Sequence, residues 1–190
     1  SPAAWLPIKP GDRVLDLCAA PGGKSTELAA KLAGTGVLFS NDISNSRAKA
    51  LLKNLEMFGA GNICVTSETP EKMAGILPEF FDKILVDAPC SGEGMFRRDP
   101  SMVKSWNEKG PDYYAPLQRQ ILDCAVQMLA PGGKLVYSTC TFDRDEDEGT
   151  IEWILEKYPE MAIVPQKPEY GFEGSRGIAG CLRLFPHRLE

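Results

Sequence analysis

Histidine is almost absent from this sequence, whose 190 residues include only His187. Histidine is the commonest general acid–base residue and the base of the Ser-His-Asp triad, so both kinds of catalysis are disfavoured. The six cysteines form no CxxC pair, which, with a single histidine, also disfavours a zinc site of the usual spacing. We therefore predict no metal site. We interpret all six cysteines as free thiols, because a chain of this length needs no disulfides to fold.

Long apolar runs are also lacking. No stretch approaches the roughly 18 apolar residues that cross a membrane, and no basic-then-apolar leader opens the chain. We expect a cytoplasmic protein without a membrane partner.

Apolar residues make up 43% of the chain and charged residues 25%, which is ordinary for one globular domain over residues 1–190. The net charge of −5 disfavours a generic nucleic-acid binder, so an RNA partner would need a local positive surface.

Short apolar runs alternate with helical patterns along most of the chain. They predict strands at 13–18, 36–41, 62–66, 81–87 and 134–139, and helices at 25–33, 44–58, 70–77, 115–129 and 145–158. This alternation is typical of an α/β protein with a doubly wound, mostly parallel sheet. Two more strand-like runs lie in 161–185 around the glycine-rich loop 171–180, and we expect them to form an antiparallel pair at one sheet edge. Ligands of such sheets bind outside the carboxyl ends of the strands.

The first predicted strand runs into a loop of small residues, 16–24, with the sequence DLCAAPGGK. Glycines let the backbone approach a ligand closely, and the following helix offers unpaired N–H groups at its start. Asp42 comes 20 residues after Gly22, at the end of the second strand, where a carboxylate can accept hydrogen bonds from a ribose. The PGGK sequence recurs at 131–134, but there it follows a helix and is typical of a turn.

Three kinds of ligand could bind this loop. A phosphate-binding P-loop would need glycine at Cys18, and a nicotinamide dinucleotide loop would need the absent G-x-G-x-x-G pattern. S-adenosylmethionine carries an adenosine without phosphates and fits best, by elimination. A tight strand-to-helix turn beside a solvated Asp42 stays open as the structural alternative.

Two cysteines follow the ends of two predicted strands. Cys90 comes after the strand 81–87, within DAPCSG, and Cys140 comes after 134–139, within STCT. Consecutive strands are usually neighbours, so we expect both thiols to face one crevice near the donor. A thiolate that adds to carbon 6 of cytosine activates carbon 5 for methylation, and a second thiol could assist release. Cys64, Cys124 and Cys181 fit the alternative role of small buried apolar residues.

At these residues the sequence resembles the Nol/Nop/Sun family of RNA cytosine-5 methyltransferases. The matching segments are DLCAAPGGKS (16–25), NDIS (41–44), VDAPCSGEGMFRRDP (86–100), the helix at 118–129 with PGGKLVYSTCTF (131–142), and RLFPH (183–187). Together they extend over nearly the whole chain in the family's order. The presence of both DAPCSG and STCTF in one chain makes the resemblance highly specific. The resemblance implies a Rossmann-like class I methyltransferase fold.

The resemblance also implies roles for single residues. Cys140 is the expected covalent nucleophile, Cys90 the thiol that helps release the product, and Asp87 a residue that helps hold the donor and the target. By residue chemistry alone, Asp87 could hold the cytosine amino group or ring nitrogen and Lys24 could counter local charge, so both are candidate catalytic residues. Because DNA cytosine-5 methyltransferases use a Pro-Cys like Pro89-Cys90 as nucleophile, the STC segment favours RNA and Cys140. The expected S-adenosylmethionine site consists of Cys18, Ala19, Ala20, Pro21, Gly22, Gly23, Lys24, Asp42, Arg47, Glu68, Asp87 and Pro89.

The sequence departs from the family pattern in three places. An acidic residue usually follows the third strand, and here Ser67 and Glu68 both stay open. Members usually continue past the FPH segment, and they carry an RNA-binding segment before the first strand. We therefore expect an excised catalytic domain, for which a non-catalytic domain that binds S-adenosylmethionine or RNA is the alternative function. A nicotinamide-dependent dehydrogenase is a third, weaker hypothesis.

The segment 95–119 is long for a connection in a compact domain. Its basic and aromatic residues suit an unstacked RNA strand, with an ordinary solvated loop as the alternative. We expect ribosomal RNA as the partner of a monomeric enzyme. We interpret the acidic run 143–148 as a solvated helix start rather than a metal site.

Overall fold

The computed structural model describes residues 1–168, 171–175 and 177–185. These residues group into two compact units, each made of two separate stretches of the chain. Ser1–Pro89 and Gln120–Ser138 form the first unit, while Cys90–Arg119 and the described residues from Thr139 onward form the second. Helix α5 (Pro111–Met128) therefore contributes residues to both units. Within the described residues, no helix is long and apolar enough to cross a membrane.

The first unit contains a five-stranded sheet in the order β3-β2-β1-β4-β5, with every neighbouring pair parallel. Its strands are β1 (Arg13–Asp16), β2 (Val37–Asn41), β3 (Ile63–Thr66), β4 (Phe81–Asp87) and β5 (Leu129–Ser138). The strand order reverses between β1 and β4, which is the topological switch point where such sheets bind ligands. The predicted doubly wound parallel sheet, with the two cysteine-preceding strands as neighbours, is confirmed.

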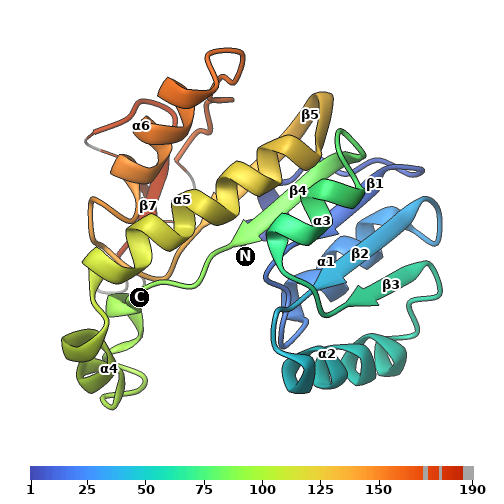
Figure 1. Cartoon of the computed structure of the whole chain (residues 1–190), viewed down its shortest axis with the longest axis horizontal. Helices are drawn as coiled ribbons and strands as arrows, with labels where there is room; N and C mark the ends of the chain where they lie inside the picture. Colours follow the sequence, from blue (N-terminus) through green and yellow to red (C-terminus); the bar gives the residue numbers. More distant parts are fainter. Residues whose placement is uncertain (169–170, 176, 186–190) are drawn as a thin grey trace. The chain divides into compact units, whose positions relative to one another are not determined.

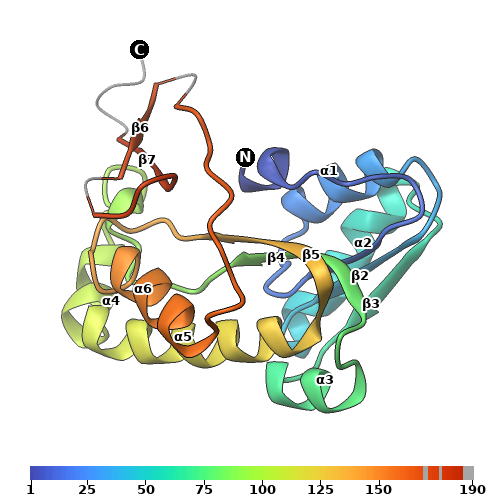
Figure 2. The same ribbon diagram turned by 90° about the horizontal axis from the view of Figure 1, so that it is seen from above.

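Helices cover both faces of this sheet. Figure 2 shows α1 (Gly23–Leu32) and α2 (Asn45–Phe58) on one side of the strands and α3 (Pro70–Ile76) on the other. Such an arrangement follows from right-handed crossovers when the strand order reverses. Figure 1 shows the strands of this sheet side by side, with the chain colour changing from blue at β1 to orange at β5.

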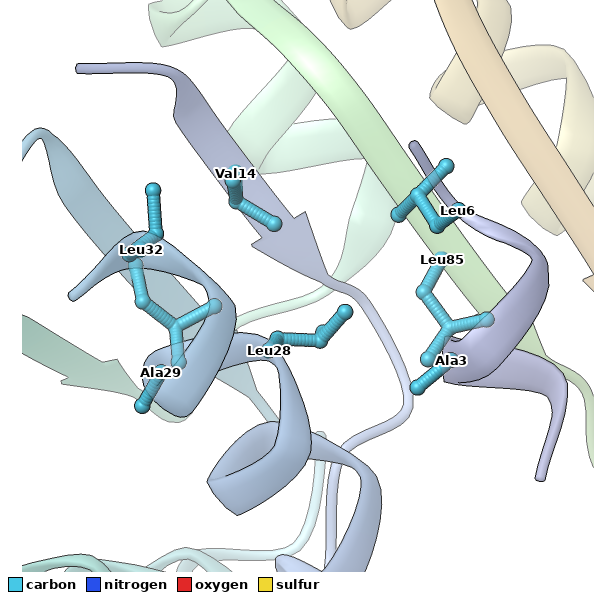
Figure 3. Close-up of a cluster of buried hydrophobic side chains, with 8 residues drawn as sticks. Ala3, Leu6, Val14, Leu28, Ala29, Leu32 and Leu85 are labelled. Carbon is cyan, nitrogen blue, oxygen red and sulfur yellow. The ribbon is translucent and has the colours of Figure 1, made fainter. Parts of the chain in front are cut away.

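A cluster of buried apolar side chains fixes α1 against the sheet. Figure 3 shows Leu28 and Leu32 of α1, one helical turn apart, facing Val14 of β1 and Leu85 of β4. Burying each leucine stabilises the fold by about 1.5–3 kcal/mol. The short 3-10 helix η1 (Pro2–Trp5), which the sequence did not predict, adds Ala3 to the same cluster. This packing sets the start of α1 at the carboxyl end of β1.

The second PGGK segment departs from expectation. Strand β5 starts at Leu129, ahead of the segment, and its pairing jumps from Phe81↔Leu129 to Lys83↔Lys134. The extra residues therefore bulge out of a continuous strand, and Gly132 has a φ of 76° there. A bulge of this kind lets the strand keep pairing on both sides of inserted residues.

The second unit combines short helices with a small sheet. Its elements are η2 (Glu93–Met95), α4 (Met102–Glu108), the first half of α5, α6 (Glu148–Lys157), β6 (Phe172–Gly174) and β7 (Leu182–Leu184). The expected antiparallel pair is present, but β6 and β7 form a two-stranded sheet of their own rather than an edge of the parallel sheet. Segment 95–119, expected as a long connection, contains α4 and the start of α5.

The acidic run 143–148 is also only partly as expected. Helix α6 begins at Glu148, three residues later than predicted. The turn before it is capped by Asp143, whose side chain accepts hydrogen bonds from the backbone N–H groups of Asp145 and Glu146. Glu146 and Glu148 are buried rather than solvated. Within the residues that the structure describes, no group of three or more His, Cys, Asp or Glu side chains could hold a metal ion.

Candidate active site

A pocket of about 270 Å³ lies at the carboxyl end of β1 in the first unit. Its lining includes Cys18, Ala19, Ala20, Pro21, Gly23, Lys24 and Asp87, all of which the sequence predicted, together with Ser1 and Pro2 from the start of the chain. Burial, with smaller contributions from nearby carboxylates, raises the pKa of the Cys18 thiol to about 12, which disfavours the thiolate form.

Gly22 is required by the geometry of the loop. It precedes α1 with a φ of 110°, a left-handed conformation that L side chains rarely adopt. A Cβ atom there would come within 2.9 Å of the buried Leu51 Cδ1. The missing side chain thus lets the start of α1 approach α2 closely.

Helix α2 and strand β2 hold the loop through its backbone. Asn54 Nδ2 donates to the Pro21 carbonyl at 2.7 Å, and Arg47 Nη2 donates to the Ala20 carbonyl at 3.2 Å. The Ala19 N–H donates to the Asn41 carbonyl at 2.8 Å. Sequence reasoning missed Asn54 and Asn41, since a lone asparagine gives no signal of what it will contact in the fold.

The predicted ribose-binding carboxylate is largely buried. Asp42 is 3% exposed; its Oδ1 accepts from the Ser44 N–H at 2.9 Å, and its Oδ2 lies 3.0 Å from Arg47 Nη2. Asn41 joins this strand end to the next one, because its side chain hydrogen-bonds both the N–H and the carbonyl of Glu68. The Glu68 carboxylate itself pairs with Lys72 Nζ at 2.7 Å.

Lys24 and Asp87 form an ion pair at the pocket wall. Lys24 Nζ lies 2.7 Å from Asp87 Oδ2, and Ser138 Oγ donates to Asp87 Oδ1 at 2.6 Å. The pair links the start of α1 to the ends of β4 and β5. Both side chains are about one-third exposed, so they stay accessible to a ligand in the pocket.

A second carboxylate, missed from the sequence, lies beneath the loop. Asp16 is fully buried, and its Oδ2 accepts a hydrogen bond from Ser25 Oγ at 2.7 Å. Ser40 Oγ donates in turn to Ser25 Oγ at 3.0 Å. Burial raises the Asp16 pKa to about 7, although the Ser25 hydrogen bond lowers it. This buried network connects the ends of β1 and β2 to the first turn of α1.

The second unit brings the two predicted thiols together. Cys90 Sγ and Cys140 Sγ are 3.1 Å apart, and the Cys140 N–H donates to Cys90 Sγ at 3.3 Å. Cys90 is buried, whereas Cys140 is exposed. The contact with Cys140 raises the pKa of the Cys90 thiol, and burial raises it further. Cys90 therefore keeps its proton, and Cys140 is the more accessible sulfur of the pair.

Short-range contacts fix the residues around Cys140. The Gly94 N–H donates to the Cys140 carbonyl at 2.8 Å, and a Cβ on Gly94 would lie 2.7 Å from that oxygen. Glu93 Oε2 accepts from the Phe142 N–H at 3.2 Å, and Ser91 Oγ hydrogen-bonds Thr141 Oγ1 at 2.9 Å. The DAPCSGEG motif thus supports the STCTF segment as well as supplying Cys90.

The other predicted site residues neither line the pocket nor belong to the Cys90–Cys140 pair. Gly22, Asp42, Arg47, Glu68 and Pro89 are not among the residues that line the pocket. Cys64, Cys124 and Cys181 are free thiols; Cys124 is buried, and the other two are half-buried. Of the RLFPH segment, Pro186 and His187 lie outside the described residues.

Comparison with known proteins then identifies the family. Residues 3–190 match the family described as "16S rRNA methyltransferase RsmB/F". The chain belongs to this family. The match confirms the resemblance to Nol/Nop/Sun RNA methyltransferases that the motifs indicated.

Relatives within the RsmB/F family are longer than this chain. It is 41% identical over 177 residues to Ribosomal RNA small subunit methyltransferase F of Cronobacter sakazakii, a stretch of 92% of this chain and 37% of that protein. It is 45% identical over 149 residues to the protein of the same name from Enterobacter sp. strain 638, which is 78% of this chain and 31% of that one. The chain therefore spans about a third of the length of these relatives.

Solved structures share the fold. The structure of NSun6 from Pyrococcus horikoshii with SFG superposes with a TM-score of 0.86 at 31% identity, covering 99% of this chain and 47% of that one. A methyltransferase homolog protein from Pyrococcus horikoshii gives a TM-score of 0.73 at 34% identity, covering 90% of this chain and 52% of that one. Both likenesses agree with the Rossmann-like class I fold that the sequence predicted.

Proposed function

We propose that this chain is the catalytic part of an S-adenosylmethionine-dependent enzyme that methylates carbon 5 of cytosine in ribosomal RNA. Cys140 is the covalent nucleophile, and Cys90 assists release of the product. The observation that carries the proposal is the pair of sulfur atoms 3.1 Å apart, with one thiol buried and the other exposed. A purely structural cysteine pair would have no need to expose one member.

The pocket of the first unit fits S-adenosylmethionine. Its loop of small residues allows close backbone approach, and Asp87 can accept hydrogen bonds from the amino group of the methionine part. Asp42 and Glu68 follow the ends of β2 and β3, where the ribose and adenine parts would bind. When bound, the ligand supplies the methyl group. The related NSun6 structure was solved with SFG, an analogue of this donor.

The two thiols have complementary tasks. Cys140 as a thiolate adds to carbon 6 of cytosine, which makes carbon 5 nucleophilic enough to accept the methyl group. A solvent water then takes the proton on carbon 5, the electron pair of that C–H bond restores the double bond between carbons 5 and 6, and the bond between Cys140 sulfur and carbon 6 breaks to regenerate the Cys140 thiolate. Cys90, which keeps its proton, can hydrogen-bond the departing Cys140 sulfur. Lys24 offsets the charge of Asp87 at the donor pocket.

The second unit also carries the residues proposed to face RNA. Arg97 and Arg98 follow η2, Lys104 lies in α4, Lys109 follows it, and all four are exposed. Lys109 Nζ lies 4.5 Å from the ring centroid of the exposed Tyr113. Basic groups beside an accessible ring suit the phosphates and bases of an unpaired strand. The target cytosine must be unpaired for carbon 6 to be reached.

Replacing Cys140 tests the proposal. Cys140→Ala should lower methyl transfer by about a thousandfold or more, since it removes the exposed thiol that forms the covalent bond to carbon 6. The measurement is 5-methylcytosine in small-subunit ribosomal RNA after incubation with donor. Cys64→Ala, which removes a half-buried thiol on β3, should leave the rate unchanged. Continued synthesis of 5-methylcytosine by Cys140→Ala would overturn the mechanism.

Replacing Cys90 separates the two thiols. Cys90→Ala should accumulate a covalent protein–RNA adduct, visible as a mass shift on a denaturing gel, because release is impaired while addition is retained. Adding Cys140→Ala to this variant should remove the adduct. If the unchanged protein binds S-adenosylmethionine in calorimetry yet neither methylates RNA nor forms an adduct, the non-catalytic binding domain is the correct function.

A further inference from the structure

Arg183 on β7 reaches back to the segment that carries Cys140, although 43 residues separate them in the sequence. Its Nη1 donates to the Phe142 carbonyl at 3.0 Å, and its Nε donates to Glu148 Oε1 at 2.8 Å. Its Nη2 also contacts Glu148 and lies 3.2 Å from Asp147 Oδ2. The side chain is 17% exposed, so these contacts are well shielded from water.

These contacts hold both flanks of Cys140. On one side, Asp147 Oδ1 accepts a hydrogen bond from Thr139 Oγ1, the residue before Cys140. On the other side, Arg183 binds the Phe142 carbonyl directly, and the Phe142 ring stacks on Phe185 with centroids 5.5 Å apart. The nucleophile segment is thus tied at both ends to one guanidinium group.

The guanidinium also keeps two carboxylates in place, the partly buried Asp147 and the buried Glu148. Burial raises the Asp147 pKa to about 6, while Thr139 and Arg183 lower it. Burial would also raise the pKa of Glu148, but hydrogen bonds from Arg183 and Ser175 lower it to about 2. Without the Arg183 guanidinium, the negative charges of Asp147 and Glu148 would repel each other. Asp147 would then no longer be held in position to accept the hydrogen bond from Thr139.

We propose that Arg183 is a positioning residue that sets the placement of the Cys140 sulfur through Asp147–Thr139 on one side and Phe142 on the other. This inference rests on the proposed function of Cys140. The Arg183 guanidinium contacts the Phe142 carbonyl and the carboxylate that binds Thr139, so it acts through the backbone segment 139–142. Its effect is therefore expected on the rate of chemistry and not on the binding of RNA.

The experiment compares four variants of the protein. Arg183→Ala removes every contact, Arg183→Lys keeps the charge without the planar set of donors, and Asp147→Asn weakens only the Thr139 side. Arg13→Ala is the matched control: it removes another arginine–carboxylate pair, with Asp82, at the amino end of β1 in the first unit. Each variant is measured for kcat and KM with RNA, thermal unfolding, and the rate at which iodoacetamide alkylates Cys140, followed by peptide mass spectrometry.

Arg183→Ala should lower kcat by about 30-fold or more, while KM for RNA changes less than threefold. A misplaced Cys140 sulfur that raises the activation free energy by about 2 kcal/mol has that effect on the rate. Arg183→Lys should recover part of kcat, and Asp147→Asn should show a smaller loss. The alkylation rate of Cys140 should change in the same order, while Arg13→Ala lowers the unfolding temperature without changing kcat or alkylation.

The inference is wrong if the loss of kcat in Arg183→Ala matches that in Arg13→Ala at equal loss of stability, or if the loss appears in KM. It is also wrong if Cys140 alkylation is the same in every variant. The alkylation measurement needs no RNA. A protein that methylates no RNA would therefore contradict the proposed function while the positioning role is still tested.

Discussion

Segment 18–24 in the first unit and segment 139–142 in the second both follow a parallel strand, but different forces hold them. The first is shaped by close backbone packing: Gly22 leaves room for Leu51, and neighbouring side chains bind its carbonyl groups. The second is held by polar side chains: Glu93 and Arg183 from distant parts of the chain, and Asp147 from the turn that follows the segment. The comparison suggests that a rigid backbone suits ligand binding, whereas a network of hydrogen bonds suits the placement of one reactive atom.

Gly22→Ala should have the largest effect and should act on the first unit alone. The left-handed φ and the 2.9 Å approach to Leu51 together should destabilise the protein by about 2–4 kcal/mol. We expect affinity for S-adenosylmethionine to fall about 100-fold, because about 3 kcal/mol of loop rearrangement then opposes binding. Calorimetry gives the affinity and thermal unfolding the stability.

Gly75→Ala is the control for this change, since a Cβ there meets nothing within 4 Å and Gly75 lies in α3. It should leave donor affinity unchanged and stabilise the protein by up to about 1 kcal/mol. Equal donor affinity in Gly22→Ala and Gly75→Ala would show that the loop does not depend on close packing.

Gly94→Ala should act on the second unit alone, with a smaller effect. Its Cβ would lie 2.7 Å from the Cys140 carbonyl oxygen, so the Cys140 backbone must shift. We expect methyl transfer to fall about tenfold to 100-fold, through a misplacement worth about 1.4–2.7 kcal/mol. Affinity for S-adenosylmethionine should stay as in the unchanged protein. A Gly94→Ala variant that loses donor affinity as strongly as Gly22→Ala would abolish the contrast between the two segments.

Asn54→Ala should have the smallest effect. It removes one hydrogen bond to the Pro21 carbonyl, which contributes about 1 kcal/mol, so donor affinity should fall about fivefold. Asn62→Ala removes a matching bond, from Asn62 Nδ2 to the Thr35 carbonyl at 2.8 Å, and should leave the affinity unchanged. Titration of both variants in parallel measures the difference. Identical titrations would mean that Asn54 stabilises the fold without shaping the pocket.

Much of the first unit was predictable because its signals are local. The sequence predicts strand 81–87 with its observed bounds and places the loop 16–24 directly before the first helix, which begins at Gly23, two residues earlier than predicted. Apolar periodicity and glycines act over a few residues, so a sequence displays them directly. Helix α4 was missed because seven largely polar residues give little periodic pattern, and η1 was missed because it has a single turn.

The second unit was harder to predict for a physical reason. The sequence predicts the antiparallel pair β6–β7 at an edge of the parallel sheet, but the pair forms a sheet of its own. The apolar pattern of a three-residue strand does not indicate which sheet the strand joins. The burial of Glu146 and Glu148 could not be foreseen either. A run of acidic residues is ordinarily solvated unless partners such as Arg183 arrive from elsewhere in the chain.

The sequence by itself determined the parallel sheet, the glycine loop after its first strand and the two cysteines after neighbouring strands. Each of these depends on residue types within a short window. Only the tertiary structure decided that Cys90 is buried while Cys140 is exposed, and that Arg183 joins Asp147, Glu148 and Phe142. Burial and ion pairing depend on contacts between residues far apart in the chain, which the fold creates and no local pattern records.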